Sequence, residues 1–375
     1  MTPAEVRATE AAHAFVTAHV SPNVIAWDRG LADSRALLAD AARAGLLGLE
    51  VPVAQGGQGL SFGCKWRVAE ILAAGDFGMA MSVINSHNVA NHLARAAAPE
   101  LASRYVPMLL SGQRAGCTAL TEPGAGSDFS AITTHARPAG DGWQLDGQKA
   151  WIVNATHADV IVVYAQTAPG SGAGGIAAFL VDGTREGFVR DPASDSGAAR
   201  AIDAGGFRLQ AYRCRASELL HPPGQAFKAA LTSINGARIY VAAMCCGMVA
   251  ECLRVASAYG SHRLTFGKAL REHQGWRWPL ADAAIDLEAA RLLVEAAAAR
   301  VDRGSDAQAA AAKAKVFATR MAGRHIPALM HAMGAEGLRE HHPFLRHLAA
   351  AQVATLVDGS TEMLLERVAK DWRGA

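Results

Sequence analysis

The chain has little of what membrane, secreted and nucleic-acid-binding proteins need. Its 36 basic and 34 acidic residues nearly balance, so charge does not favour binding to nucleic acid or to an anionic membrane surface. There is no run of eighteen apolar residues, so no transmembrane span is expected. The polar start MTPAE lacks the basic and apolar regions of a signal peptide. These absences predict a soluble protein.

Cysteine is also scarce and badly placed for a structural role. The six cysteines are scattered, and two of them, Cys245 and Cys246, are adjacent within an apolar helical stretch. Such spacing suits neither a zinc site nor a disulfide framework. We therefore expect a reducing, cytoplasmic location and no bound metal.

The chain is too long for one core, and its texture changes twice. Residues 1–115 have helical patterns with short breaks, 116–222 contain short strand-like runs, and 223–375 return to long helices. Expected strands are 143–153 (with a hairpin at Asp146-Gly147), 160–165, 177–181 and 207–214, and expected helices are 227–259, 281–303, 306–333 and 347–372. The prediction is an α+β fold, mostly α: a helical domain, a β-barrel or sandwich domain, and a four-helix bundle.

The stretch ALTEPGAGSD at 119–128 cannot form a regular helix. Its proline and glycines forbid one, and the glycines let the backbone approach a ligand closely. Thr121, Ser127 and free loop N–H groups are donors for a polar ring edge or a phosphate. Taken alone, such a stretch is more often a plain tight turn.

An expected helix at 81–98 has unusual polar content. Asn85, Asn88 and His92 share one face by their i, i+3, i+7 spacing. That face is either solvated or in contact with a polar ligand. Histidines there also suit a metal, but no carboxylate or cysteine is near in sequence, so we do not predict one.

Five strings in order make the sequence similar to the acyl-CoA dehydrogenase family. The 119–128 stretch resembles the family's first signature. The others are KAWIVN at 149–154 (family K-x-W-I-T-N), RLTFGKALREHQ at 263–274 (R-x-x-F-G-K-x-L-x-x-x-Q), HAMGAEGL at 331–338 (Q-x-x-G-G-x-G-[FY]) and VDGSTEML at 357–364 ([YF]-E-G-[TS]-x-[QE]-[IM]). The resemblance extends over nearly the whole chain.

The resemblance implies FAD as the cofactor. Trp151 would pack against the flavin, while Val153 replaces the family's threonine and leaves only a backbone N–H. Arg263 would hold the diphosphate with its forked donors. The residues implied to contact FAD are Leu120, Thr121, Gly126, Ser127, Trp151, Ile152, Val153, Arg263, Phe266, Gln274, His331, Gly334, Ser360 and Glu362. Outside this context Trp151 would be a core aromatic and Arg263 a surface cation.

The resemblance also implies a catalytic base. Asp358 stands where the family has glutamate, and a carboxylate in a dry site suits removal of a weakly acidic proton. Some relatives place the base on the long helix instead, but Ala237 at that position cannot serve. The alternative for Asp358 is an acid that merely flanks a helix. The residues implied to contact substrate are Ser127, Arg238, Asn88 and Gly359.

The implied activity is α,β-dehydrogenation of an acyl-CoA or acyl-carrier thioester, a reaction of lipid metabolism. The implied partners are an electron acceptor such as an electron-transfer flavoprotein and further copies of the chain, as a dimer or tetramer that shares FAD across an interface. The Asn/His helix favours a short, branched, cyclic or polar acyl group. Two alternatives remain: a flavin oxidase of the same fold, similar to nitroalkane oxidases, which also have aspartate at the base position, and a catalytically silent binder of FAD or thioester.

Overall fold

The computed structural model describes residues 1–32, 35–192 and 199–373. The chain begins with helices, continues as a sheet, and ends with longer helices. The first helices are α1 (Pro3–Phe15), a π-helical turn (Val16–Val20), α2 (Val24–Asp28), α3 (Leu37–Arg43), α4 (Phe62–Gly75), α5 (Phe77–Ala96) and α6 (Pro99–Leu110). The later ones are α7 (Ala226–His262), α8 (Gln274–Asp302), α9 (Gln308–Ala332), α10 (Phe344–Leu356) and α11 (Thr361–Arg373).

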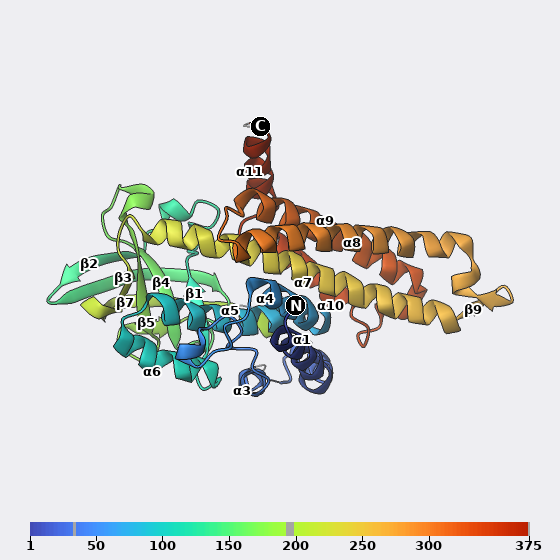
Figure 1. The fold of residues 1–375 in the computed structure, drawn as a ribbon, viewed down its shortest axis with the longest axis horizontal. Coiled ribbons are helices and arrows are strands. Elements are labelled where there is room, and N and C mark those ends of the chain that lie inside the picture. Colours follow the sequence, from blue (N-terminus) through green and yellow to red (C-terminus); the bar gives the residue numbers. More distant parts are fainter. Residues whose placement is uncertain (33–34, 193–198, 374–375) are drawn as a thin grey trace.

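The molecule is elongated (Figure 1). The sheet lies at one end, and α7, α8 and α9 run side by side away from it. At the opposite end lies a small hairpin of β9 (Leu264–Thr265) and β10 (Lys268–Ala269). Helix α11 stands out from the bundle and carries the C-terminus.

Capping side chains explain where several helices begin. Thr2 and Glu5 form a reciprocal capping box at the start of α1. The Ser61 hydroxyl accepts from the N–H of Cys64 at 3.0 Å at the start of α4. Asp76 accepts from the N–H of Met79 at 2.7 Å and separates α4 from α5. Each side chain satisfies an N–H that the helix cannot pair internally.

In the part of the chain that the structure describes, the sheet has eight strands in the order β6-β7-β3-β2-β4-β5-β8, and β1 pairs with β4. The strands are β1 (Gly116–Ala119), β2 (His135–Ala139), β3 (Gly142–Ile152), β4 (Val160–Gln166), β5 (Ile176–Asp182), β6 (Phe188–Arg190), β7 (Gly205–Arg215) and β8 (Leu219–His221). Both β4 and β5 are buried along their whole length. The strands expected at 160–165, 177–181 and 207–214 are confirmed.

The expected hairpin at Asp146-Gly147 is wrong, because β3 runs straight through it. The tight turn is Gly140-Asp141, between β2 and β3. Gly147 instead marks a bulge, where the register with β7 shifts. Its φ is 151°, and a Cβ there would lie 2.5 Å from the Cα of Thr134. Glycine is needed for close backbone approach, not for a turn.

Helix α7 is the core of the C-terminal part and packs against α4, α8 and α9. A Cβ at Gly247 would lie 2.0 Å from the carbonyl oxygen of Glu70, so glycine lets α7 and α4 touch. By length and composition α7 could cross a membrane, but 72% of its most apolar window is buried inside the protein. Burial of this kind is what a core helix of a folded domain shows.

The helix expected at 347–372 is wrong as one element, since the chain breaks into α10 and α11. Asp358 has a φ of 54° and Gly359 a φ of 103°, both left-handed. Neither conformation can continue an α-helix. The break therefore falls on the residue predicted to be the base.

Candidate active site

The base segment, residues 357–359, is held by two cations that bond its backbone. The Nε of Arg238 on α7 donates to the carbonyl of Asp358 at 2.9 Å. The Nζ of Lys315 on α9 donates to the carbonyl of Val357 and, at 2.6 Å, to that of Gly359. Three consecutive carbonyls are thus satisfied from outside the segment. A left-handed non-glycine residue costs about 1–2 kcal/mol, which these bonds offset.

Asp358 lies in an environment that suits a general base. Burial raises the pKa of its carboxyl, while Lys315 and Arg238 oppose the increase. Burial also lowers the pKa of Lys315 to about 8, against the attraction of Asp358. A carboxylate that is desolvated but still ionised is a stronger base than one in water.

A largely buried polar network connects α4, α5 and α7, and its Tyr240 feels the charge of Asp358. We use "polar network" for Glu50, Lys65, His87, Asn88 and Tyr240. Lys65 forms an ion pair with Glu50 and donates to the Oδ1 of Asn88 at 3.3 Å. The Nδ2 of Asn88 donates to the hydroxyl of Tyr240 at 3.2 Å. Burial, and then the charge of Asp358, raise the pKa of Tyr240 well above its usual range.

The polar network bears on the helix predicted at 81–98, whose polar face was expected to be either solvated or in contact with a polar ligand. That face is not solvated: Asn88 is bonded on both sides, and Oδ1 of Asn85 is buried. The Nε2 of His92 lies 3.0 Å from that of His221, and burial lowers the pKa of His92 to about 4. No carboxylate is near this helix in sequence, but one is near in space, because Nε2 of His87 lies 3.2 Å from the carboxylate of Glu50. That carboxylate already forms an ion pair with Lys65, which takes the place that a metal ion would have.

The 119–128 stretch is an anchored loop rather than a free turn. Glu122 is buried, and its carboxylate accepts from the Nζ of Lys149 at 2.9 Å and from the N–H groups of Thr133 (2.6 Å) and Thr134 (2.9 Å). Burial opposes ionisation, but these partners lower the pKa of Glu122 to about 2. The ion pair fixes the loop and leaves Gly126 and Ser127 exposed.

Trp151 is no core aromatic, because 70% of it is exposed, at a φ of 60°. Trp151 comes two residues after Lys149. The N–H of the intervening Ala150 donates to the carbonyl of Thr121 at 3.1 Å, which holds this part of β3 against the 119–128 loop. An exposed indole beside a glycine-rich loop fits a flat ring system. The side chains of Ile152 and Val153 are buried in the core, so only their backbone is available to a cofactor.

Asn154 connects the loop region to α5. Its Nδ2 donates to the carbonyls of Ser82 and Gly116, both at 3.1 Å, and to the hydroxyl of Ser86 at 3.2 Å. Two residues further along α5 is Asn88 of the polar network. Helix α5 therefore borders both the loop region and the network next to the base segment.

A third group of predicted residues lies far from these, at what we term the hairpin end: residues 263–274 and 331–336. Phe266 at the tip of the β9–β10 hairpin is 99% exposed. The Nε1 of Trp276 donates to the carbonyl of Ala332 at 2.8 Å, which joins the start of α8 to the end of α9. Within one chain, the hairpin lies at the opposite end of the molecule from the sheet (Figure 1).

The remaining predicted positions have more local surroundings. Leu120 is partly buried, and its carbonyl accepts from the Nζ of Lys149 at 2.9 Å. Ser360 precedes α11 and Glu362 lies in its first turn, where a backbone hydrogen bond and then the Ser360 hydroxyl lower the pKa of Glu362. Arg263, Gln274, His331 and Gly334 are exposed.

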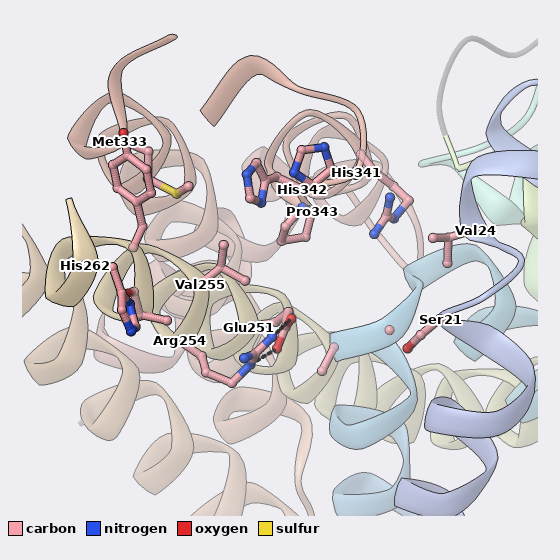
Figure 2. A pocket seen from close by; sticks show the side chains of 15 residues that line it. Ser21, Val24, Glu251, Arg254, Val255, His262, Met333, His341, His342 and Pro343 are labelled. Carbon is pink, nitrogen blue, oxygen red and sulfur yellow. Dashed lines mark hydrogen bonds and ion pairs between the residues drawn. The ribbon is translucent and has the colours of Figure 1, made fainter. Parts of the chain in front are cut away.

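One pocket lies apart from the base segment. Its volume is about 520 Å³, and it lies between the second half of α7 and the segment that enters α10. Figure 2 shows side chains of His262 and Arg254 on one wall and of His341 and His342 on another. Asp358 is not among the residues that line it.

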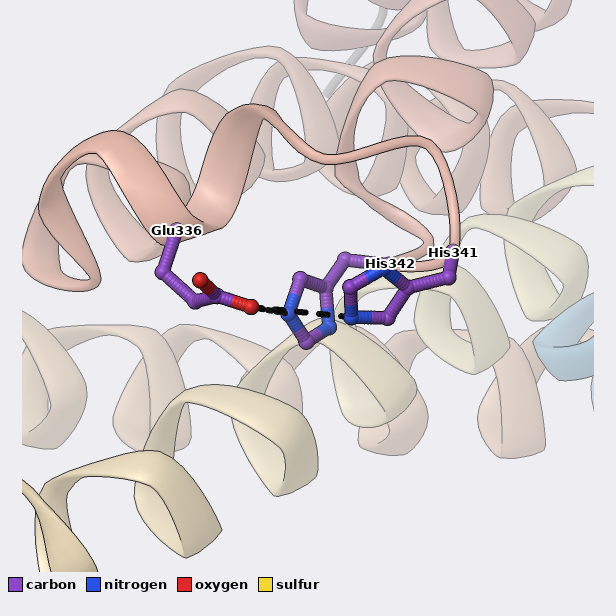
Figure 3. A group of neighbouring side chains, drawn as sticks. All are labelled: Glu336, His341 and His342. Carbon is purple, nitrogen blue, oxygen red and sulfur yellow. Dashed lines mark hydrogen bonds and ion pairs between the residues drawn. The ribbon is translucent and has the colours of Figure 1, made fainter.

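At the rim of this pocket, Glu336, His341 and His342 form a cluster that could hold a metal ion (Figure 3). Oε1 of Glu336 lies 3.2 Å from Nε2 of His342 and 3.6 Å from that of His341. However, Arg339 also pairs with this carboxylate, at 3.6 Å. The cluster is explained as a surface ion-pair group.

Comparison with known proteins identifies the class. Family models for the acyl-CoA dehydrogenase N-terminal, middle and C-terminal domains match residues 2–113, 117–211 and 224–372. The chain is 30% identical over 370 residues to the mitochondrial short/branched chain specific acyl-CoA dehydrogenase of Rattus norvegicus, covering 98% of this chain and 85% of that one.

Two solved structures are similar over almost the whole chain. Butyryl-CoA dehydrogenase from Megasphaera elsdenii has a TM-score of 0.95 at 28% identity, over 99% of this chain and 98% of that one. A glutaryl-CoA dehydrogenase from Mycobacterium smegmatis in complex with FADH2 has a TM-score of 0.93 at 26% identity, over 100% and 96%.

The chain therefore belongs to the acyl-CoA dehydrogenase family and is an oxidoreductase of that flavin-dependent class. The predicted fold class, mostly helical with a central β-region, is confirmed.

Sequence reasoning missed the side chains that hold the site together. Lys313 and Lys315 lie in the alanine-rich run AAAAKAKVF, and two positions apart they cannot share one face of a helix, so a lysine on the apolar face was a signal that could have been followed. Glu50 and Lys65 carried no such signal. They are fifteen residues apart in sequence and meet only because a loop folds back on α4.

Proposed function

We propose that this protein catalyses FAD-dependent α,β-dehydrogenation of an acyl thioester, with Asp358 as the base that removes the α-proton. The observation that supports this most strongly is the base segment: a carboxylate on a left-handed residue, raised in pKa by burial and held by Arg238 and Lys315. A flanking acid of no function would not need three carbonyl bonds to hold it in a costly conformation.

FAD fits the residues of two separate regions. The loop at 119–128 with exposed Trp151 would hold the flavin, and Arg263, Phe266 and Gln274 would hold the diphosphate of a cofactor bound to a second copy. These regions lie at opposite ends of one chain, which favours a homo-oligomer with a shared cofactor. When bound, FAD accepts the hydride that leaves the β-carbon. Position and electrostatics come from the protein.

The substrate end is proposed to be small and partly polar. Named relatives act on short, branched or glutaryl thioesters. In this chain the Asn88 amide donates to the Tyr240 hydroxyl, and Tyr240 lies close enough to Asp358 for the carboxylate charge to raise its pKa, so polar groups border this side of the site. An electron-transfer flavoprotein is the proposed acceptor, and a cytoplasmic location is proposed.

The test is an anaerobic titration of the FAD-loaded protein with short, branched, cyclic, dicarboxylic and long acyl-CoA thioesters. Bleaching of the flavin by one class supports the proposal and names the substrate. Asp358→Asn should keep FAD but slow reduction by roughly 10²–10⁴-fold, the usual contribution of general base catalysis. Asp371→Asn, which removes an exposed acid on α11, is the matched control.

Two results would overturn the proposal. One is full activity in Asp358→Asn. The other is a bound flavin that no thioester bleaches. Rapid oxygen consumption by the reduced protein would assign it instead to the oxidases that share this fold and have aspartate at the base position.

A further inference from the structure

Lys315 is almost completely buried, with 1% of its surface exposed, yet no carboxylate lies within ion-pair distance of it among the described residues. A buried ammonium without a close counterion is costly and needs polar partners. Its partners are the carbonyls of Val357 and Gly359, on both sides of Asp358. These two hydrogen bonds join residues that are 42 and 44 positions apart in the sequence.

We propose that Lys315 is a positioning residue for the base: its ammonium clamps the two carbonyls that flank Asp358, fixes the left-handed backbone there, and supplies positive charge beside the carboxylate. This inference rests on the proposed role of Asp358. Arg238 completes the clamp from α7 by bonding the carbonyl of Asp358 itself.

The geometry explains why a cation is used. A helix or a strand pairs its carbonyls with backbone N–H groups, whereas these three successive carbonyls are paired by side chains, so the backbone shape between α10 and α11 depends on those donors. A single ammonium has three N–H groups and can serve two carbonyls at once. A rotation of the segment would move the carboxylate, and a displacement of about 1 Å can cost roughly 10²-fold in rate.

Electrostatics support the same role. The groups that act on Asp358 are Lys315 from α9 and Arg238 from α7, and Tyr240 from α7 responds to its charge. Arg367 of α11 acts on Arg238. Two cations thus oppose the rise in pKa that burial causes at Asp358, and loss of either should make the carboxyl harder to ionise.

The experiment compares Lys315→Met and Lys315→Arg with Lys313→Met. Lys313 lies on the same helix but is half exposed and pairs with Asp371 at 3.1 Å. The first measurement is the pH dependence of the flavin absorbance without substrate. The step that Asp358→Asn abolishes reports the base, and Lys315→Met should move its midpoint up by about one pH unit.

The second measurement is flavin reduction by an active thioester. Lys315→Met should lower the reduction rate by roughly 10–100-fold with a much smaller change in KM, because positioning rather than binding is lost. Lys315→Arg should recover part of both effects, and Lys313→Met should match the wild type. A merely structural lysine would lower the folded fraction without moving the midpoint.

An unmoved midpoint in folded Lys315→Met, or the absence of any step that depends on Asp358, would overturn the clamp. This readout needs no substrate. A protein that no thioester reduces would contradict the proposed function, while the midpoint would still decide on the clamp.

Discussion

Lys315 and Phe266 both belong to the helical C-terminal part of the chain, but they are 1% and 99% exposed. Around the base segment, polar and charged groups pair with one another. Lys315 donates to backbone carbonyls, Lys65 forms an ion pair with Glu50, and Asn88 donates to Tyr240. At the hairpin end, Arg263, Phe266 and Gln274 face outward.

This difference separates two uses of polar residues. Near the base, the protein's own folding fixes the geometry, so changes should affect both stability and chemistry. At the hairpin end, the fold gains little from the exposed side chains, so changes should affect binding of the cofactor or of a second copy and leave stability alone.

The largest effect is expected from Glu50→Gln. Removing this carboxylate leaves the Lys65 ammonium buried without its counterion, which should cost about 3–5 kcal/mol in the free energy of unfolding. Urea unfolding at pH 7 measures it. Glu295→Gln, which breaks the exposed pair with Arg67, should cost at most about 1 kcal/mol. Equal losses would mean that the interior pair is no more important than the surface one.

The next largest effect is expected from acid, which should lower the free energy of unfolding through Glu50 of the polar network. Burial alone would raise the pKa of Glu50, but Lys65 and His87 lower it to about 2, below its unfolded value. Its contribution is therefore complete above the unfolded pKa, near pH 4.5, and is lost as the pH falls toward 2.

The loss is on the order of 3 kcal/mol over that window. Urea unfolding at pH 6 and at pH 3 should show a steeper loss for the wild type than for Glu50→Gln. Parallel losses in the two proteins would show that other groups dominate.

A smaller effect, and of another kind, is expected from Arg263→Ala. A charge-assisted bond to a diphosphate contributes about 1.5–3 kcal/mol, so FAD should bind roughly 10–150-fold more weakly. The free energy of unfolding of the apoprotein should stay within about 0.5 kcal/mol of the wild type.

Fluorescence titration of the apoprotein with FAD measures the affinity, with exposed Arg277→Ala as the control. If Arg263→Ala instead unfolds the protein and leaves FAD affinity intact, the contrast between the two ends is wrong.

The smallest effect is expected from Tyr240→Phe. The change removes one hydroxyl and leaves Asn88 without its acceptor, at a cost of about 1 kcal/mol. The ratio of flavin reduction rates for a polar and an apolar acyl thioester of equal length should shift by roughly 2–10-fold toward the apolar one. An unchanged ratio would separate the polar network from substrate choice.

The sequence by itself determined the class of protein. Five strings in order, with glycines and a proline where loops must form, identified the family, and the apolar runs of β4, β5 and α7 predicted their elements. These features are local, and periodicity and turn chemistry express them directly. The hairpin assigned to Asp146-Gly147 failed for a related reason, since a glycine that permits close approach to Thr134 looks the same in sequence as one that turns the chain.

Only the tertiary structure decided how the site is held. Asp358 was predicted as the base from its string, but its left-handed backbone, the helix break around it and the bonds from Lys315 and Arg238 depend on residues up to 120 positions apart. The pairing of Glu50 with Lys65 likewise exists only after α4 and the preceding loop have packed. Burial changes the cost of a charge, and burial is a property of the packed molecule rather than of any short stretch of sequence.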